Sequence, residues 1–521
     1  MSETARPARG AEPLVVDGAR MAGDRVVRVL AEGGRISGIV PLSGAKSSHG
    51  GSAGGRPIDA SGLWIEPGFI DPHVHLVMAG LGLGQLDLSA VGSRDEFEAA
   101  IAERSAELPP DVWLIARGWD ESRWGGALPT AAWLDAAGPR PAVAWRMDIH
   151  SAVVNRPVLE RCDLAPPIRG GSVVQDAEGQ PTGLLLEAAA WERLNPVLPP
   201  PTAAEERAAV SLAEAHAHRA GIVAVGAMEY LDVVERVLLP TAHARTLRIR
   251  VIALDRTLPL DLPRMRAAKA ADIIRTIAAK AFIDGTLGSR TARMLASYAD
   301  APGERGMLVE LAAEGRLHDW AAQAVGGGFS VAMHAIGDEA VKIALDVSQT
   351  ARSLEPNGLV RIEHAQHVDP ADVAEFAGLI ASVQPAHRIG DHAVMHRRLG
   401  EGRAGAAFPL AGLAAAGATL AFGSDWPVID CDPAAAIAAA VHGAVRDGIA
   451  PSGHEVSIDS ALAAHTRGAA QAIGEPEGGR LVVGGRADFI LLDADPRTAN
   501  WADAPPRVVL TVAGGRVVHE A

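Results

Sequence analysis

Histidine and aspartate residues stand at the ends of apolar runs in this sequence. His73 and His75 follow the run at residues 64–70. Three later apolar runs end in His334, His364 and Asp425. Taken singly, a histidine bonded to core carbonyls or an aspartate capping a helix explains each of them better than a ligand does. Together, five metal-type ligands in this order are hard to obtain by packing alone, and they predict a metal site.

The two residues of the His73–x–His75 motif would point to the same side of a strand, because side chains alternate along it. Imidazole nitrogen and carboxylate oxygen suit zinc, and also iron, manganese or cobalt. Such a metal polarises a carbonyl and lowers the pKa of water to ~7. Asp425 would take a proton from that water and pass it to a leaving nitrogen. We therefore expect a divalent cofactor, zinc in first place, with one or two ions per chain.

The elements that must position these residues alternate between strand-like and helix-like segments. The strand-like runs lie at residues 222–225, 249–254, 329–333, 359–362, 379–383 and 419–422. A helix is expected at residues 203–220, with Thr202 as its N-cap. Alternation of this kind implies a parallel sheet. Its many repeats favour an α/β fold of the (β/α)₈ TIM-barrel type, whose active sites lie at the carboxyl ends of the strands.

The stretch from 67 to 475 is longer than the ~250 residues of a plain barrel. The surplus, at about residues 85–200, follows the first metal motif. We interpret it as an inserted subdomain over the barrel mouth.

Both chain ends contain strand-like runs but too few for a stable sheet each. Residues 14–16 and 25–30 near the start, and 489–493 and 508–512 near the end, are of this type. We expect residues 1–66 and 476–521 to form one small β-sandwich domain, with the barrel between them.

Composition limits the partners. The formal charge of −15 is spread along the chain, which argues against nucleic acid or an anionic membrane. The chain has two cysteines, Cys162 and Cys431. Neither has a partner at metal-ligand spacing, so we expect both to be small packed apolar groups. No secretory start or long apolar span is visible, which predicts a cytoplasmic protein acting on a small molecule. The sequence leaves open whether the protein forms a homo-oligomer.

The motifs around the candidate ligands resemble the signatures of the amidohydrolase superfamily. The matching blocks are residues 67–75, 334–338, 361–366, 382–385 and 423–427. The His–x–His motif is generic to the superfamily, whereas the other blocks together resemble its amidohydrolase-3 group, which includes N-substituted formamide deformylases. The resemblance extends from about Leu14 to Val518.

This resemblance implies a further ligand, Lys280. In related enzymes the lysine here is carboxylated and bridges two metals. A free ammonium would be repelled by two cations, whereas a carbamate supplies two oxygens and a negative charge. His73, His75 and Asp425 would then hold one metal, and His334 and His364 the other. The alternative is an ion pair of Lys280 with Asp284 or Glu229.

The sequence departs from the family pattern after the second strand-like run. Related sequences often have an acidic residue there, and this chain has Gly226–Met228. Either Glu229 takes that place or the position is neutral, which leaves the substrate contacts in doubt.

Substrate contacts are expected among polar and aromatic residues near the motifs. The candidates are Gln384, Trp426, Arg290 and His150, followed by His387, Trp119 and Trp124. Core packing or surface hydrogen bonding explains each of these better, except for Gln384 and Trp426, which adjoin strand ends. Asp338 is expected to cap a helix.

The leading hypothesis is an amidohydrolase that cleaves a non-peptide C–N bond. A deaminase, cyclic amidase or lactonase would use the same ligands, because fold and metal do not fix the substrate. A non-catalytic binding protein is disfavoured by the complete ligand set. A dinucleotide-dependent dehydrogenase is excluded, since no Gly–x–Gly–x–x–Gly turn follows the first strand.

Overall fold

The computed structural model describes residues 12–42, 55–147, 151–164, 168, 171–187, 189–255, 257–288, 290–443 and 452–521. The chain divides into two compact units. One comprises residues 1–76 and 213–521, and the other residues 77–212. Each unit is described by itself.

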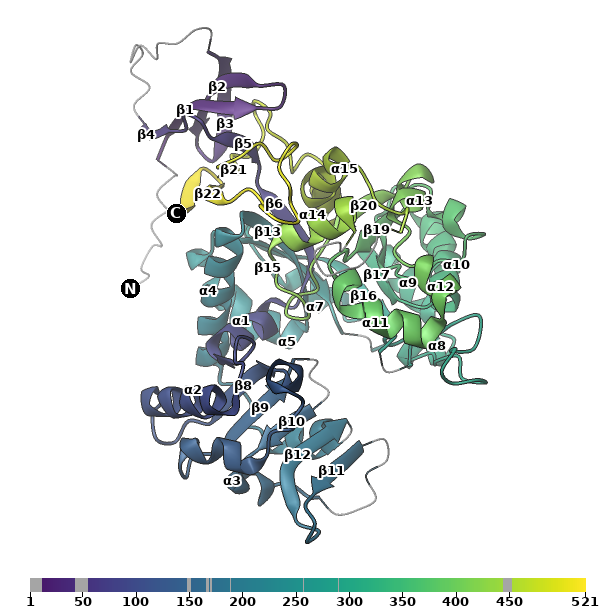
Figure 1. The fold of residues 1–521 in the computed structure, drawn as a ribbon. Coiled ribbons are helices and arrows are strands. Elements are labelled where there is room, and N and C mark those ends of the chain that lie inside the picture. Colours follow the sequence, from purple (N-terminus) through teal and green to yellow (C-terminus); the bar gives the residue numbers. More distant parts are fainter. Residues whose placement is uncertain are drawn as a thin grey trace, which may run out of the picture. The chain divides into compact units, whose positions relative to one another are not determined.

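The larger unit contains a barrel of eight parallel strands (Figure 1). In sheet order they are β6 (Phe69–Val74), β13 (Ile222–Glu229), β14 (Arg248–Ala253), β16 (Ile274–Phe282), β17 (Ser330–Ala335), β18 (Val360–His364), β19 (Ile380–Val383) and β20 (Thr419–Phe422). A short β15 (Lys269–Ala270) pairs antiparallel with β16. The segment after β20 returns to β6, where Val74 and Trp426 form a parallel bridge. The predicted (β/α)₈ barrel is confirmed.

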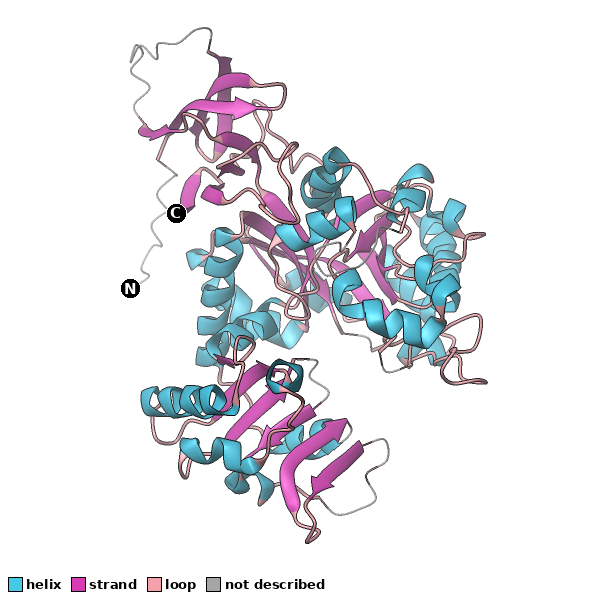
Figure 2. Ribbon diagram, viewed as in Figure 1, coloured by secondary structure: helices cyan, strands magenta, loops and turns pink. Residues whose placement is uncertain are grey.

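Helices surround these strands (Figure 2). The longer ones are α4 (Ala203–Arg219), α9 (Leu317–Gly326), α10 (Asp338–Leu354), α11 (His387–Leu399) and α14 (Pro433–His442). Shorter ones are α5 (Leu231–Val233), α6 (Leu239–Thr241), α7 (Leu262–Ala267), α8 (Glu310–Ala313), α12 (Glu401–Gly405), α13 (Leu410–Ala415), α15 (Ile458–Ala463) and α16 (Ala469–Ala472). All residues of β13 and β14 are buried, as expected where helices cover a parallel sheet.

Helix α4 begins where the sequence predicts. The Thr202 hydroxyl accepts a hydrogen bond from the Glu205 amide at 3.2 Å, and the Glu205 carboxylate accepts one from the Thr202 amide at 2.7 Å. This reciprocal capping box satisfies amide groups that have no partner within the helix.

The two chain ends meet in one hydrogen-bonded sheet, seen in Figure 1 where purple and yellow strands lie together. Its eight strands are β1 (Leu14–Met21), β2 (Arg25–Glu32), β3 (Arg35–Pro41), β4 (Arg56–Asp59), β5 (Trp64–Pro67), β21 (Phe489–Leu492), β22 (Val508–Ala513) and β23 (Arg516–Glu520). β5 pairs antiparallel with β21, with Ile65 opposite Leu491. One apolar core joins both ends through side chains such as Val16, Ile65 and Phe489. β5 then continues through Gly68 into β6, so this sheet anchors the first barrel strand.

Residues 77–212 form a separate unit between β6 and β13. Its sheet has the order β11 (Gly171–Gln175), β12 (Pro181–Glu187), β10 (Ser151–Val154), β9 (Ala142–Arg146), β8 (Leu114–Trp119) and β7 (Leu86–Asp87). Its helices are α1 (Leu76–Gly84), α2 (Arg94–Glu107) and α3 (Arg156–Leu159).

Tryptophans fill the core of this smaller unit. Trp119 is fully buried and donates its indole N–H to the Ala144 carbonyl at 2.8 Å. Trp124 packs edge-on against Phe97 and lies 5.6 Å from Trp133, centroid to centroid. Packing therefore accounts for Trp119 and Trp124.

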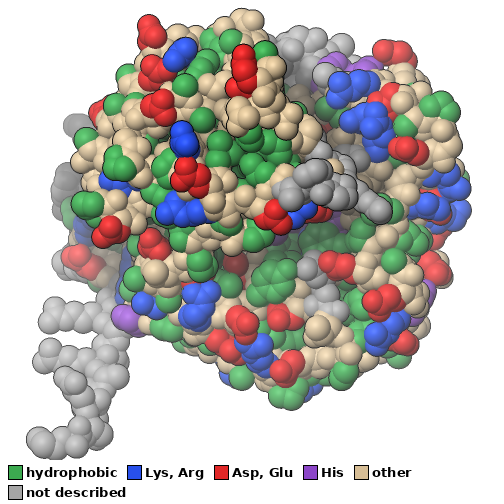
Figure 3. All heavy atoms as spheres, turned by 90° about the horizontal axis from the view of Figure 1, so that it is seen from below, with side chains coloured by type: hydrophobic (Ala, Val, Ile, Leu, Met, Phe, Trp, Pro, Cys, Tyr) green, Lys and Arg blue, Asp and Glu red, His purple; other side chains and the backbone are tan. Residues whose placement is uncertain are grey.

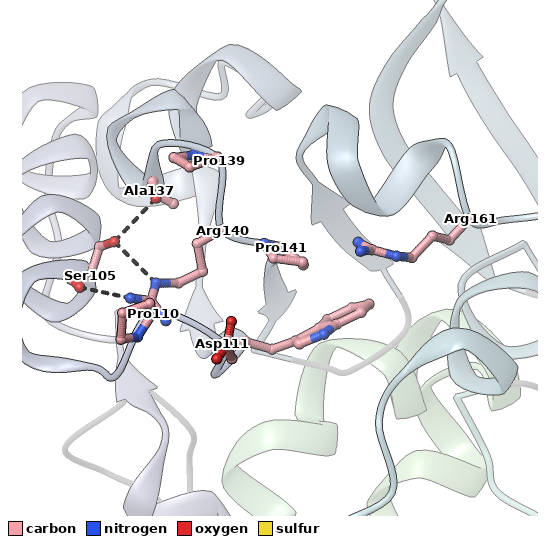
Figure 4. A pocket seen from close by; sticks show the side chains of 9 residues that line it. Ser105, Pro110, Asp111, Ala137, Pro139, Arg140, Pro141 and Arg161 are labelled. Atoms are coloured by element: carbon pink, nitrogen blue, oxygen red, sulfur yellow. Dashed lines mark hydrogen bonds between the residues drawn. The ribbon is translucent and has the colours of Figure 1, made fainter.

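A hollow of about 490 Å³ lies in the same unit (Figure 4). Arg140 lines it and donates hydrogen bonds to the carbonyls of Leu108, at 2.9 Å, and Ser105, at 3.2 Å. Arg161 lies over the Trp113 ring at 5.3 Å. The cations of this hollow thus have structural partners, and the metal motifs lie elsewhere in the chain.

On the face shown in Figure 3, acidic and basic side chains are interspersed. Among the described residues, no helix is long and apolar enough to cross a bilayer.

Candidate metal centre

The five predicted ligands lie at the carboxyl ends of four barrel strands. His73 is in β6 and His75 follows that strand, while His334 and His364 belong to the neighbouring strands β17 and β18. Asp425 follows β20, which lies on the other side of β6. The sheet order therefore brings residues that are up to 352 positions apart to one rim.

Three of these side chains converge closely. His73, His364 and Asp425 each offer one ligand atom, and these atoms all lie within 4.8 Å of one another. Oδ1 of Asp425 is 3.3 Å from Nε2 of His73 and 3.3 Å from Nε2 of His75. The His334 and His364 rings are 4.4 Å apart, centroid to centroid. All five residues thus form one cluster.

Two members of the cluster have unusual backbone conformations. His364 has φ +70° and Asp425 has φ +59°. Residues other than glycine seldom adopt this left-handed region, and such strain is typical of functional sites. His364 ends β18 and Asp425 follows β20, so the turn after each strand sets the direction of the side chain.

Gly423 explains the start of the Gly–Ser–Asp motif. A Cβ atom at this position would lie 2.9 Å from the Cβ of His73 and 3.1 Å from Oδ1 of Asp71. Any other residue would push the end of β20 away from β6, and Asp425 with it.

Asp71 fastens the same two strands. Its carboxylate accepts hydrogen bonds from the His73 amide at 3.0 Å and from the Ser424 hydroxyl at 2.6 Å. Burial raises the pKa of Asp71 to about 6, although the hydrogen bonds from Ser424 and His73 act in the opposite direction. Asp71 therefore positions His73 and the residue before Asp425.

Glu363 orients the ring of His73. Nδ1 of His73 lies 2.7 Å from Oε2 of Glu363, and both side chains are buried. Arg361 donates to the same carboxylate at 2.8 Å. Burial raises the pKa of Glu363, but the charges of Arg361 and His73 outweigh it and hold the pKa well below its usual value. With Nδ1–H bonded to a carboxylate, Nε2 faces the cluster, the arrangement typical of metal-binding histidines.

The protonation states of His334, His364 and Asp425 suit a cation. His73 differs, because burial and Lys280 act to lower its pKa but Asp425 and Glu363 outweigh them and raise it. Burial, together with the charge of Lys280, lowers the pKa of His334 to about 3. Burial and His334 hold the pKa of His364 well below its usual value. Burial acts against ionisation of Asp425, but His73 and His75 outweigh it and keep its pKa low. Neutral imidazoles and a carboxylate are the forms that bind metal.

An orphaned atom gives a direct test of the fit. Nδ1 of His334 is buried and has no hydrogen-bond partner among the described residues. Its Nε2 is 3.2 Å from the Gly285 carbonyl. Buried polar atoms are almost always satisfied, and a metal ion accounts for an unsatisfied ring nitrogen beside His364. The donor set therefore fits a divalent ion.

Lys280 belongs to β16 and is 1% exposed. Its Nζ lies 4.0 Å from the sulfur of Met228 and 5.2 Å from the centre of the Phe282 ring. Its charge contributes to the lowered pKa of both His334 and His364, so it faces the cluster.

The carboxylate of Asp284, considered above as a partner of Lys280, binds the backbone instead. It accepts hydrogen bonds from the amides of Arg293, at 2.8 Å, and Gly337, at 2.9 Å. Burial raises the pKa of Asp284 to about 7 against these hydrogen bonds.

Comparison with known proteins agrees with this geometry. Residues 56–519 match the amidohydrolase family. The chain belongs to this family. It is 26% identical to an N-substituted formamide deformylase of Arthrobacter pascens, over 90% of each chain. It is 32% identical to the Protein LONG AFTER FAR-RED 3 of Arabidopsis thaliana, over 89% of this chain and 84% of that protein. An uncharacterized metal-dependent hydrolase from Pyrococcus horikoshii has a similar structure, with a TM-score of 0.76 and 25% identity over 94% of this chain and 99% of that one.

Among the substrate contacts expected of this amidohydrolase, Gln384 and Trp426 lie beside the ligands. Gln384 is 1% exposed, and its amide nitrogen is 3.3 Å from Nδ1 of His73. The carbonyl of Trp426 accepts a hydrogen bond from the His75 amide at 2.8 Å, and its ring stacks on His216. Both residues contact the ligands or their backbone, and so support the site.

The other residues that were expected to contact substrate have different surroundings. Arg290 forms an ion pair with Asp300 at 3.0 Å, and the same carboxylate binds Arg398. The ring of His387 lies 6.3 Å from that of His364, centroid to centroid. Asp338 begins α10 and accepts the amides of Leu295 and Glu339, so it holds a loop as well as the helix end. His150 lies outside the described residues.

The glycine that replaces the family's usual pattern after the second strand-like run also has a structural reason. A Cβ atom on Gly226 would lie 2.2 Å from the Pro72 carbonyl, so β13 needs glycine there to pair with β6. Glu229 is the last residue of β13 and is buried.

Sequence reasoning missed three charged residues that support the ligands, Asp71, Arg361 and Glu363, and considered Asp284 only as a partner of Lys280. A usable signal was present, because each interrupts or ends an apolar strand where a charge without a partner would be costly.

Proposed function

We propose that this amidohydrolase cleaves a non-peptide, amide-type C–N bond of a small molecule at a metal centre on the barrel rim. The observation that carries the proposal is the convergence of His73, His364 and Asp425 within 4.8 Å, with His334 and His75 beside them. The proposed ligand set is His73, His75, His334, His364, Asp425 and Lys280. We propose a divalent ion with zinc in first place, and iron, manganese and cobalt accept the same nitrogen and oxygen donors.

A divalent ion supplies Lewis-acid polarisation of the substrate carbonyl and an acidified water. The chain supplies the remaining steps. Asp425 accepts the proton of the attacking water and returns it to the leaving nitrogen, which makes the amine a good leaving group. Glu363 keeps His73 oriented throughout, and Asp71 keeps Asp425 at its distance from His73 and His75 through Ser424.

Lys280 is proposed to act as a carbamate. Its neutral amine adds to carbon dioxide: the C–N bond forms as one C=O π bond opens, oxygen takes the negative charge, and one proton leaves to solvent. The product has a negative charge where an ammonium would stand beside cations. Lys280 is 1% exposed and its charge acts on both His334 and His364, and this place beside the ligands supports the proposal.

Formamides are the first substrates to test, because one relative is named as an N-substituted formamide deformylase. Deamination, cyclic-amide hydrolysis and lactone hydrolysis would use the same metal ligands, so these activities are the alternatives. The insert at residues 77–212 is proposed to influence the choice among them.

The test combines metal analysis with a substrate panel. The purified protein, reconstituted with zinc, manganese, iron or cobalt, is assayed on N-substituted formamides, simple amides, cyclic imides, aminopurines and lactones. Release of an amine and a carboxylate from an amide or formamide supports the proposal. Ammonia release from aminopurines alone, or turnover of lactones alone, would replace it with the corresponding alternative. Failure to retain any ion would overturn it.

A further inference from the structure

A second group of metal-type ligands lies on the loop that follows the catalytic Asp425. This loop joins β20 to α14 and ends in Asp430, Cys431 and Asp432. Helix α4 passes beside it and contributes His216. One ligand atom each from His216, Asp430 and Cys431 lies within 4.8 Å of the others. None of these residues belongs to the centre described above.

We propose that His216, Asp430 and Cys431 form a separate site for zinc or another thiophilic divalent ion, which fastens the loop after β20 to helix α4. No pattern in the sequence links Cys431 to His216, because the two residues are 215 positions apart.

Two of the three proposed ligands are in direct contact. Nε2 of His216 lies 2.9 and 3.0 Å from the two carboxylate oxygens of Asp430. In a tetrahedral zinc site with bonds of about 2.0–2.3 Å, neighbouring ligand atoms are about 3.3–3.8 Å apart. A small displacement of the Asp430 side chain, which is 51% exposed, makes room for an ion. Water can take the fourth position from this open side.

The ligand types select the ion. Thiolate, imidazole and carboxylate together suit zinc, whereas magnesium and calcium prefer oxygen alone. Cys431 is 2% exposed, which shields a metal–sulfur bond from solvent.

The electrostatic surroundings also favour a cation. The carboxylates of Asp430, Asp71 and Asp432 all act electrostatically on Cys431. Their negative potential attracts a divalent ion.

Arg219 is the group that competes with the ion. Its Nη2 lies 3.1 Å from Nδ1 of His216 and donates to it, which leaves the proton of a neutral ring on Nε2, facing Asp430. Metal binding at Nε2 requires that proton to move to Nδ1. The Arg219 side chain is exposed and can turn away from His216. Replacing it with a residue that can accept a hydrogen bond from Nδ1 should increase the affinity for the metal ion.

An ion here would act on the loop that holds Trp426. The His216 ring stacks on the Trp426 ring at 5.1 Å, and the Trp426 carbonyl binds the His75 amide. Fixing His216 and Cys431 together therefore immobilises both ends of the segment between Asp425 and Asp432.

Cobalt substitution tests this site apart from the catalytic centre. All proposed ligands of the catalytic centre are nitrogen and oxygen, so a thiolate-to-cobalt charge-transfer band in the near ultraviolet can arise only at a cysteine. The full-length protein is stripped of metal and titrated with Co²⁺. We expect the band, its loss in Cys431→Ser and in His216→Gln, and its retention in the matched control Cys162→Ser. Arg219→Gln should give the band at a lower cobalt concentration.

Added zinc should displace cobalt and abolish the charge-transfer band. In the folded protein, zinc should also slow the reaction of Cys431 with a thiol reagent. A wild-type protein without the band at saturating cobalt, or a band that persists in Cys431→Ser, would overturn the proposal. If Cys431→Ser does not fold, Asp430→Asn at an exposed position gives the same test, since it should weaken binding and leave the fold intact. If cobalt binding is unchanged in Asp430→Asn, His216 and Asp430 form only a hydrogen bond between α4 and the loop, and the proposed site is refuted.

Discussion

Nδ1 of His73 lies 2.7 Å from the carboxylate of Glu363, and both side chains are shut off from solvent. The two residues are 290 positions apart, and barrel closure brings them together. Because Arg361 holds the other side of this carboxylate, Glu363 has one orientation available. It fixes which nitrogen of His73 faces Asp425, and hence the geometry of the whole cluster.

Glu363→Gln should weaken metal binding. The amide can still accept the Nδ1–H hydrogen bond, but the negative charge that makes His73 a stronger ligand is gone. Loss of such a supporting partner typically costs about 10–100-fold in metal affinity. Competition with a chelator measures this, with Glu401→Gln, 90% exposed, as the control. Equal affinities in wild type and Glu363→Gln would contradict this role.

Asp425→Asn should leave most of the metal in place while turnover falls. The amide oxygen still faces Nε2 of His73 and His75, but it cannot accept the proton. Loss of a general acid–base group typically costs about 10²–10⁴-fold in rate. Metal content and kcat are measured on the same preparation. If kcat survives, another group carries the proton; if metal is lost together with kcat, Asp425 acts mainly as a ligand.

Lys280→Ala should lose at least one metal ion per chain where two are bound. The substitution removes the proposed carbamate, and a short carboxylic acid in excess can replace its oxygens, so added acid should restore part of the activity. Lys269→Ala, on the neighbouring β15 and exposed, is the control. Full metal occupancy with normal turnover in Lys280→Ala would remove Lys280 from the centre.

The barrel could be predicted because its evidence is local. Each strand is a short apolar run, as at Ile222–Glu229, and each ligand follows such a run directly. The joint sheet of the two chain ends followed from a count of strands, since neither end can form a stable sheet alone.

The supporting residues could not be placed, because their partners are distant in sequence. Glu363 was part of a recognised motif, yet only the order of β18 and β6 around the barrel shows that it meets His73. Cys431 shows the same limit, since its neighbour His216 comes from a helix whose apolar periodicity says nothing about that contact. The insert was recognised from surplus length, but its Trp119 and Trp124 could be assigned to a core only from their contacts.

A last prediction concerns stability in acid and rests on Glu214 in α4. Its carboxylate accepts hydrogen bonds from the amide of Thr246, at 2.6 Å, and the amide of Leu247, at 3.0 Å, and it pairs with Arg245 at 2.8 Å. Burial raises the pKa of Glu214, but hydrogen bonds from His218, Thr246 and Leu247 outweigh it and lower the pKa to about 2.

Because the pKa of Glu214 is lower in the folded than in the unfolded chain, its ionised form stabilises the fold above the unfolded value, 4.5. This contribution is lost as the pH falls from about 4.5 through about 2. The difference corresponds to about 3 kcal/mol at neutral pH. Glu214→Gln should therefore unfold at a lower denaturant concentration than wild type at pH 7, and the gap should narrow as the pH falls below 4.5. Denaturant unfolding of both proteins between pH 7 and pH 3 measures the gap, with the exposed Glu355→Gln as control. A gap that stays constant across this range would show that Glu214 contributes through its shape and not through its charge.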